Sequence, residues 1–146
     1  MNKIIAQLTV VFMLFSTVAC SHLESTIKDD IQNNNKEYTE LVQTIGKCDF
    51  PRFSYGQFIA KKHFPSELVE VLSHTKLKDK IQYIILIKNA DCDHVTFELL
   101  SGRYHIIFNS CPNSNFPLPD SYKKEGFIET WGINNNWFIW KDNDFI

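Results

Sequence analysis

Residues 92–111, CDHVTFELLSGRYHIIFNSC, decide the fold of this chain. Two runs of alternating apolar and polar residues flank Ser101-Gly102, a dipeptide typical of a two-residue hairpin turn. Each residue before such a turn pairs with the residue equally far beyond it. Val95 then faces Phe108, and Glu98 faces His105, so that apolar meets apolar and polar meets polar. The segment therefore predicts an antiparallel hairpin with one apolar and one polar face.

The same register places Cys92 opposite Cys111. Cross-strand positions separate Cβ atoms by about 4.5–5.5 Å, near the range that a disulfide needs. Strict continuation of the register makes this a hydrogen-bonded pair, in which the side chains lie farther apart, although hairpin ends often deviate. We predict a Cys92–Cys111 disulfide, and Cys48 is the competing partner for either cysteine.

Further strands are predicted on both sides of this hairpin. Residues 81–87 form a nearly continuous β-branched run, which is typical of a central strand covered on both faces. Segments 126–133 and 137–140 flank an asparagine-rich turn and predict a second hairpin. Residues 112–125, which contain three prolines, are predicted to be a loop. The facing of three tryptophans stays open: Trp131, Trp137 and Trp140.

Helical signals precede the strands. Residues 36–45 carry apolar side chains at helical spacing, and Gly46 is a typical C-terminal stop. A short helix is predicted around residues 55–62, and Pro65-Ser66-Glu67 marks the start of another. The aromatic residues of segment 48–64 are interpreted as core packing, because aromatic side chains dominate cores of this size. The predicted class is α+β, with two to three N-terminal helices packed on a curved antiparallel sheet of about five strands.

The first twenty residues have the pattern of an export signal. Lys3 precedes an apolar run from Ile4 to Phe15, and small residues follow it. The run is shorter than the roughly 20 apolar residues that a membrane-spanning helix needs. Residues 1–19 are therefore predicted to be a cleaved signal peptide. Secretion without lipidation and an uncleaved anchor are the alternatives.

Thr17-Val18-Ala19-Cys20 resembles the lipobox of bacterial lipoproteins, with Thr17 where leucine is usual. The resemblance implies cleavage before Cys20 and attachment of acyl chains, palmitate among them, to its sulfur and amino group. Each buried methylene contributes about 0.8 kcal/mol, so several chains hold a protein firmly at a membrane. Within this family, Ser21 after the cysteine implies an outer-membrane location facing the periplasm.

The length and composition of the chain after the signal peptide are those of one folded domain. Residues 20–35 are predicted to be the lipidated cysteine and a polar tether, and residues 36–146 a single α+β domain. The formal net charge of −2 argues against a nucleic-acid partner, because phosphates call for a basic face. Walker A, G-x-S-x-G, H-E-x-x-H and G-x-G-x-x-G motifs are absent from the sequence, so neither a cofactor nor a catalytic residue is predicted.

Two further resemblances concern the domain. Helices followed by a long sheet and a Trp-bearing hairpin are similar to cystatin-like and nuclear-transport-factor-like α+β rolls, a likeness carried by Leu41–Phe53 and Trp131–Ile139. Ser101-Gly102-Arg103-Tyr104 resembles the S-G-x-x-Y loop of bacterial lysozyme-inhibitor lipoproteins, with one residue fewer between glycine and tyrosine. That family is an all-β barrel, and the helical signals argue against it here.

One local cluster has the residue types of a metal or thiol site. Asp91-Cys92-Asp93-His94 combines thiolate, imidazole and carboxylates, and Cys111 lies across the predicted hairpin. The same cysteines cannot be both a disulfide and metal ligands, so no metal site is predicted. The charge of Asp49 is expected to raise the pKa of the Cys48 thiol, which opposes a nucleophilic role.

The leading hypothesis is a membrane-anchored envelope lipoprotein with a non-enzymatic binding role, of the inhibitor or immunity type, and with a protein partner. The candidate interaction face is the polar side of the hairpin: His94, Glu98, Arg103 and His105. One alternative is a small-ligand carrier with a cavity between helices and sheet, lined by residues such as Phe58, Phe97 and Trp131. The other is a thiol- or metal-dependent enzyme around Cys92, His94 and Cys111.

Overall fold

A computed structural model describes residues 23–50, 53–89, 92–99, 102–111 and 117–144. Among these residues, three helices pack against one side of a seven-stranded antiparallel sheet, so the class is α+β as predicted. The signal peptide and Cys20 lie outside the described residues. Within the described part of the chain, no helix is long and apolar enough to cross a bilayer.

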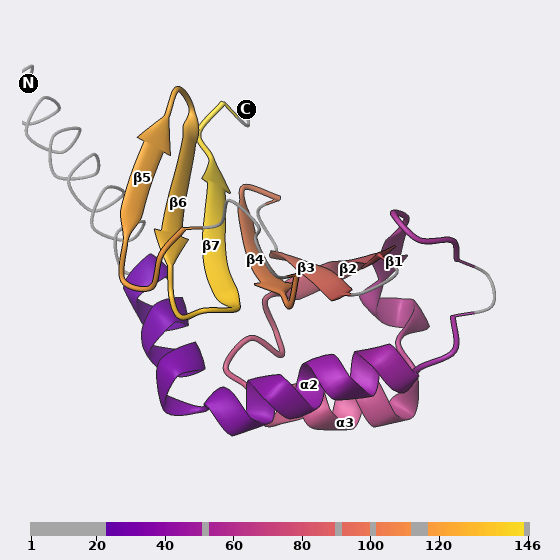
Figure 1. Cartoon of the computed structure of the whole chain (residues 1–146). Helices are drawn as coiled ribbons and strands as arrows, with labels where there is room; N and C mark the ends of the chain where they lie inside the picture. Colours follow the sequence, from indigo (N-terminus) through magenta and orange to yellow (C-terminus); the bar gives the residue numbers. More distant parts are fainter. Residues whose placement is uncertain (1–22, 51–52, 90–91, 100–101, 112–116, 145–146) are drawn as a thin grey trace, which may run out of the picture.

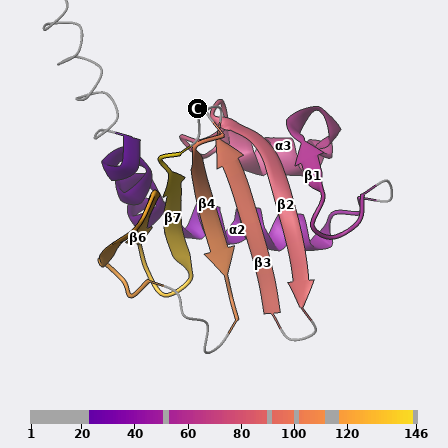
Figure 2. The same cartoon turned by 90° about the horizontal axis from the view of Figure 1, so that it is seen from above.

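The helices are residues 23–33, α2 (Asn35–Lys47) and α3 (Ser66–Ser73), with a 3-10 turn, η1 (Lys61–His63). The strands are β1 (Phe58–Ala60), β2 (Ile81–Asn89), β3 (Cys92–Leu99), β4 (Tyr104–Asn109), β5 (Tyr122–Glu125), β6 (Ile128–Gly132) and β7 (Trp137–Asp142). Their order is β1-β2-β3-β4-β7-β6-β5, and all neighbours are antiparallel. The sheet is strongly curved, since β5–β7 stand nearly upright beside β1–β3 in Figure 1. Figure 2 shows α2 crossing beneath β2, β3 and β4.

The prediction of about five strands is wrong, because two edge strands were missed. β1 lies where the sequence predicts a short helix, and β5 lies inside the predicted loop 112–125. They have only three and four residues, and β5 is exposed throughout, so neither shows an alternating pattern. Pairing with β2 and β6, rather than local sequence, makes them strands. β2 also differs from expectation, because the helices cover only one face of the sheet and Ile87 is exposed on the other.

The structure places residues from Leu23 onward in the domain, where the sequence predicts a tether. Ile27 and Ile31 in helix 23–33 are fully buried. The Glu24 carboxylate accepts a hydrogen bond from the Tyr104 hydroxyl at 2.9 Å and contacts Lys141 Nζ at 3.1 Å. The polar composition of this stretch reflects the solvent side of an amphipathic helix.

The central hairpin has the predicted register, with Val95 opposite Phe108 and Glu98 opposite His105. Its predicted turn falls partly outside the described residues, since Ser101 is one of those not described. The apolar side of the hairpin packs around Trp137, whose ring lies 5.9 Å from that of Phe97 and 5.1 Å from that of Phe108.

Cys92 and Cys111 form the predicted disulfide, with Cα atoms 4.8 Å apart. This separation is nearer to that of a non-hydrogen-bonded pair (about 4.5 Å) than to that of a hydrogen-bonded pair (about 5.5 Å). The paired ladder ends at His94 and Asn109, and the amide of Asn109 donates to the carbonyl of Asn136 on the neighbouring turn. Because that amide points toward β7 rather than β3, His94–Asn109 is a non-hydrogen-bonded pair of β3 and β4. Cys92–Cys111, two residues further along the same register, is then also a non-hydrogen-bonded pair, not the hydrogen-bonded pair expected from the sequence.

Candidate functional site

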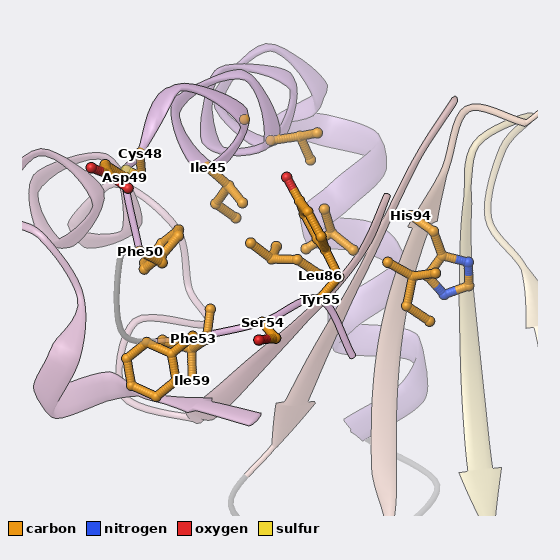
Figure 3. Close-up of a pocket in the computed structure, with 14 residues that line it drawn as sticks. Ile45, Cys48, Asp49, Phe50, Phe53, Ser54, Tyr55, Ile59, Leu86 and His94 are labelled. Atoms are coloured by element: carbon orange, nitrogen blue, oxygen red, sulfur yellow. The ribbon is translucent and has the colours of Figure 1, made fainter. Parts of the chain in front are cut away.

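A pocket of about 330 Å³ lies between the end of α2, the segment that follows it and strands β1–β3. Ile45 from α2, Phe50 from the connecting segment and Leu86 from β2 surround it in Figure 3. The other apolar side chains in the lining are Val42, Phe53, Ile59 and Val95. Its volume falls at the lower end of the range of small-molecule pockets, about 300–1,000 Å³.

Backbone hydrogen bonds fix the outer wall of this pocket. The amide of Gly56 donates to the carbonyl of Leu86 at 2.8 Å, and the amide of Ser54 donates to the side chain of Gln57 at 2.9 Å. Leu86 and Val95 are paired across β2 and β3, so they share the helix-facing side of the sheet. The pocket is thus formed where the sheet, α2 and a tight turn meet.

Cys48 and Asp49 lie at the margin of the pocket (Figure 3). Cys48 is half-buried and is the free cysteine among the described residues. Burial raises the pKa of its thiol, and the charge of Glu67 raises it further. The direction is the predicted one, but burial and Glu67, rather than Asp49, cause it. A protonated thiol is a weak nucleophile, so the chemistry here favours binding over covalent catalysis.

A second, polar hollow of about 500 Å³ adjoins Cys48 and Asp49 on the side of α3. Its lining includes Lys47 and Glu67, whose charged groups stay solvated at the surface. Ligand pockets are lined mainly by hydrophobic and aromatic side chains, so the smaller pocket, which has phenylalanine, isoleucine, leucine and valine in its lining, is the better candidate site.

Exposed apolar side chains lie beside the pocket, and we call Tyr55, Phe58 and Ile87 the apolar rim. Tyr55 and Ile87 also line the pocket. Phe58 pairs with Ile85, which lies two residues from Ile87 on the same face of β2. Exposed large apolar side chains gathered near a pocket are a feature of interaction sites in soluble proteins.

The predicted interaction face is largely covered. The side chains of Glu98 and His105 are only 16% and 12% exposed, with His105 Nε2 3.9 Å from Glu98 Oε2. The His105 ring also packs at 4.6 Å against Trp140. His94 Nε2 lies 3.2 Å from Thr96 Oγ1 on the same face.

Arg103 has a structural role instead. Its guanidinium donates to the carbonyl of Asp142 at 3.2 Å and to the side chain of Asn143 at 2.9 Å, which fastens the end of the chain to the sheet. The four predicted residues therefore form no common exposed surface.

Burial disfavours charge in the Glu98–His105 pair. It lowers the pKa of His105, against a smaller opposing effect of Asp142, and it raises the pKa of Glu98. His105 Nδ1 is buried and has no hydrogen-bond partner. The pair is therefore a weakly satisfied polar contact between β3 and β4.

Cys92 and Cys111 cannot serve as thiolate ligands of a metal ion, because their sulfurs are joined in the disulfide. Across the described ranges, no group of three or more His, Cys, Asp or Glu residues is placed to hold a metal ion. Asp91 lies outside those ranges.

The side chains that the sequence led us to expect around a cavity do not line the observed pocket. Phe97 is buried in the core, Trp131 lies against Lys141 at 5.8 Å, and Phe58 lies on the opposite face of the sheet from Ile59. Phe50 and Phe53 pack against the core, as the sequence predicts, and they also line the pocket. Their density, without helical or strand periodicity, is the one signal that could have indicated the site.

Comparisons with family models, curated proteins and solved structures found no match for this chain. A proposal for its function therefore depends on the pocket, the apolar rim and the N-terminal sequence.

Proposed function

We propose that this chain is an envelope lipoprotein, anchored through Cys20, that binds a protein partner at the pocket and its apolar rim. The observation that carries the proposal is the pocket, whose lining includes the exposed residues Tyr55 and Ile87. Its location in a bacterial envelope, with the outer membrane as the preferred site, follows from the lipobox-like residues alone.

The physical chemistry of interfaces supports a protein partner. Interfaces depend on a few apolar side chains that fill pockets, surrounded by contacts that exclude water. A 330 Å³ pocket accommodates such an anchor, and the rim supplies further apolar area to cover. An inhibitor or immunity-type protein would use this arrangement to occupy the surface of an envelope enzyme or toxin.

A small-ligand carrier is the second candidate, and the pocket volume is the observation that favours it. The ligand would be a small molecule with both apolar and polar groups, because Asp49, Ser54 and His94 line the cavity together with its apolar side chains. Such a ligand would occupy the pocket without engaging Phe58, which lies outside it.

A photo-crosslinking experiment in living cells separates the two candidates. A benzophenone amino acid is placed at Ile87, which is 41% exposed, and at Val69 on α3, which is 44% exposed, as a matched control. A protein partner predicts a discrete adduct at position 87 that is weak or absent at position 69. Leu86→Trp, which fills the pocket, should reduce this adduct. Equal or absent adducts at both positions would reject the proposed site.

The carrier predicts a different result. Native mass spectrometry of the detergent-extracted chain should then show a bound small molecule, and Leu86→Trp should lose it. The anchor is tested independently by mass spectrometry of the N-terminal peptide. Acylated Cys20 supports it, and an unmodified N-terminus at another residue refutes it.

A further inference from the structure

Helix 23–33 runs beside the last hairpin, in the same direction as β6. Near its start, Glu24 Oε1 lies 3.1 Å from Lys141 Nζ on β7, at the level where β6 begins. Near its end, Gln32 Nε2 donates to the carbonyl of Ile133 at 3.3 Å, just after β6 ends. The start of the helix therefore points toward the end of the molecule that holds the β5–β6 turn.

The tip of the β5–β6 hairpin presents an exposed aromatic side chain. Phe127 is 62% exposed, and its carbonyl accepts a hydrogen bond from the amide of Asn143 at 2.9 Å. Lys124 on β5 forms an ion pair with Glu129 at 3.3 Å, which ties the two strands together. In Figure 1 the tip extends beyond the first described turn of helix 23–33. The hydrogen bond and the ion pair thus fix the hairpin that exposes the Phe127 side chain at its tip.

The connection from Cys20 to this end of the domain is short. Leu23 already packs against the core, and the chain from Cys20 to Leu23 can span at most about 11 Å. A bilayer that holds acyl chains on Cys20 must therefore lie close to the start of the helix.

We infer that the acylated chain rests on the lipid surface through the β5–β6 tip, with Phe127 in contact with the bilayer interface. This inference rests on the proposed acylation of Cys20. Aromatic side chains are favoured at the boundary between headgroups and acyl chains. The acyl chains supply the affinity, and the tip sets the orientation of the domain.

Lipid quenching tests this orientation in the full chain, acylated in cells and reconstituted into phosphatidylethanolamine and phosphatidylglycerol vesicles. In a Cys48→Ser background, a nitrobenzoxadiazole label is placed by Glu125→Cys beside the tip, or by Glu70→Cys on α3. Both positions are exposed. We expect nitroxide lipids to quench the label at position 125 at least twofold more than the label at position 70. Phe127→Ser should at least halve that difference.

Flotation of the vesicles distinguishes failure of the lipid anchor from failure of the proposed orientation. Protein that floats but is quenched equally at positions 125 and 70 refutes the orientation and leaves the anchor intact. A Phe127→Ser variant with unchanged quenching refutes the assignment of Phe127. Protein that fails to float, like a Cys20→Ser control, refutes acylation and the orientation with it.

Discussion

Replacing Ile27 by alanine tests whether the domain begins before residue 36. Ile27 is fully buried, so the substitution removes three carbon atoms from the core. Transfer of those atoms costs about 2.4 kcal/mol at about 0.8 kcal/mol each. The cavity left behind brings the expected loss of unfolding free energy to about 2–5 kcal/mol. Ile31, also fully buried on the same helix, should behave alike.

The assay is urea unfolding of the chain without its first twenty residues, followed by tryptophan fluorescence. Asn33→Ala is the matched control, because Asn33 is exposed on the same helix and its replacement should change stability by no more than about 0.5 kcal/mol. A tether would tolerate all three substitutions equally. If the unfolding free energy of Ile27→Ala stays within about 0.5 kcal/mol of that of the parent chain, helix 23–33 does not contribute to the fold. The domain would then begin near residue 36, as the sequence predicts.

Three other predictions concern stability. Cys92→Ser opens a disulfide that spans 19 residues and should lower the unfolding free energy by about 3 kcal/mol in a urea titration. Gly132→Ala should cost about 1–3 kcal/mol in the same assay, because its Cβ would collide with the carbonyl of Leu118, whereas Gly46→Ala has open space and should not destabilise. Burial lowers the pKa of His105, so the unfolded chain binds this proton more tightly. Stability should therefore fall as pH drops from about 6.5 through the lowered value, and His105→Gln should remove that part of the pH dependence.

The central hairpin could be predicted because its information is local. A short turn sets the register, and alternation on both strands leaves one pairing that matches apolar with apolar, as with Val95 and Phe108. The disulfide followed from the same register. Only the hydrogen-bonding phase of the cysteine pair, which follows from the bond of the Asn109 amide to the carbonyl of Asn136, depended on tertiary structure.

The edge strands and the pocket could not be predicted in this way. Phe58–Ala60 is a strand because β2 lies beside it, and three residues are too few to show a period. The pocket depends on where α2 ends relative to β2, a relation between segments that no local pattern encodes. The partial burial of the polar hairpin face could not be predicted for a similar reason, because packing against Trp140 helps to cover His105.

The two proposed contacts lie at opposite edges of one sheet. β1 borders the pocket and β5 carries the hairpin tip, and β2, β3, β4, β7 and β6 lie between them. Six strand spacings of about 4.8 Å separate those edges by about 29 Å along the sheet. A domain seated on a bilayer through Phe127 would hold Ile87 away from the lipid, so only a partner reaching out from the membrane or moving freely in the periplasm could occupy the pocket. The same crosslinking group should therefore capture lipid at position 127 and protein at position 87, and capture of lipid at both positions would show that the domain lies on the membrane by a different face.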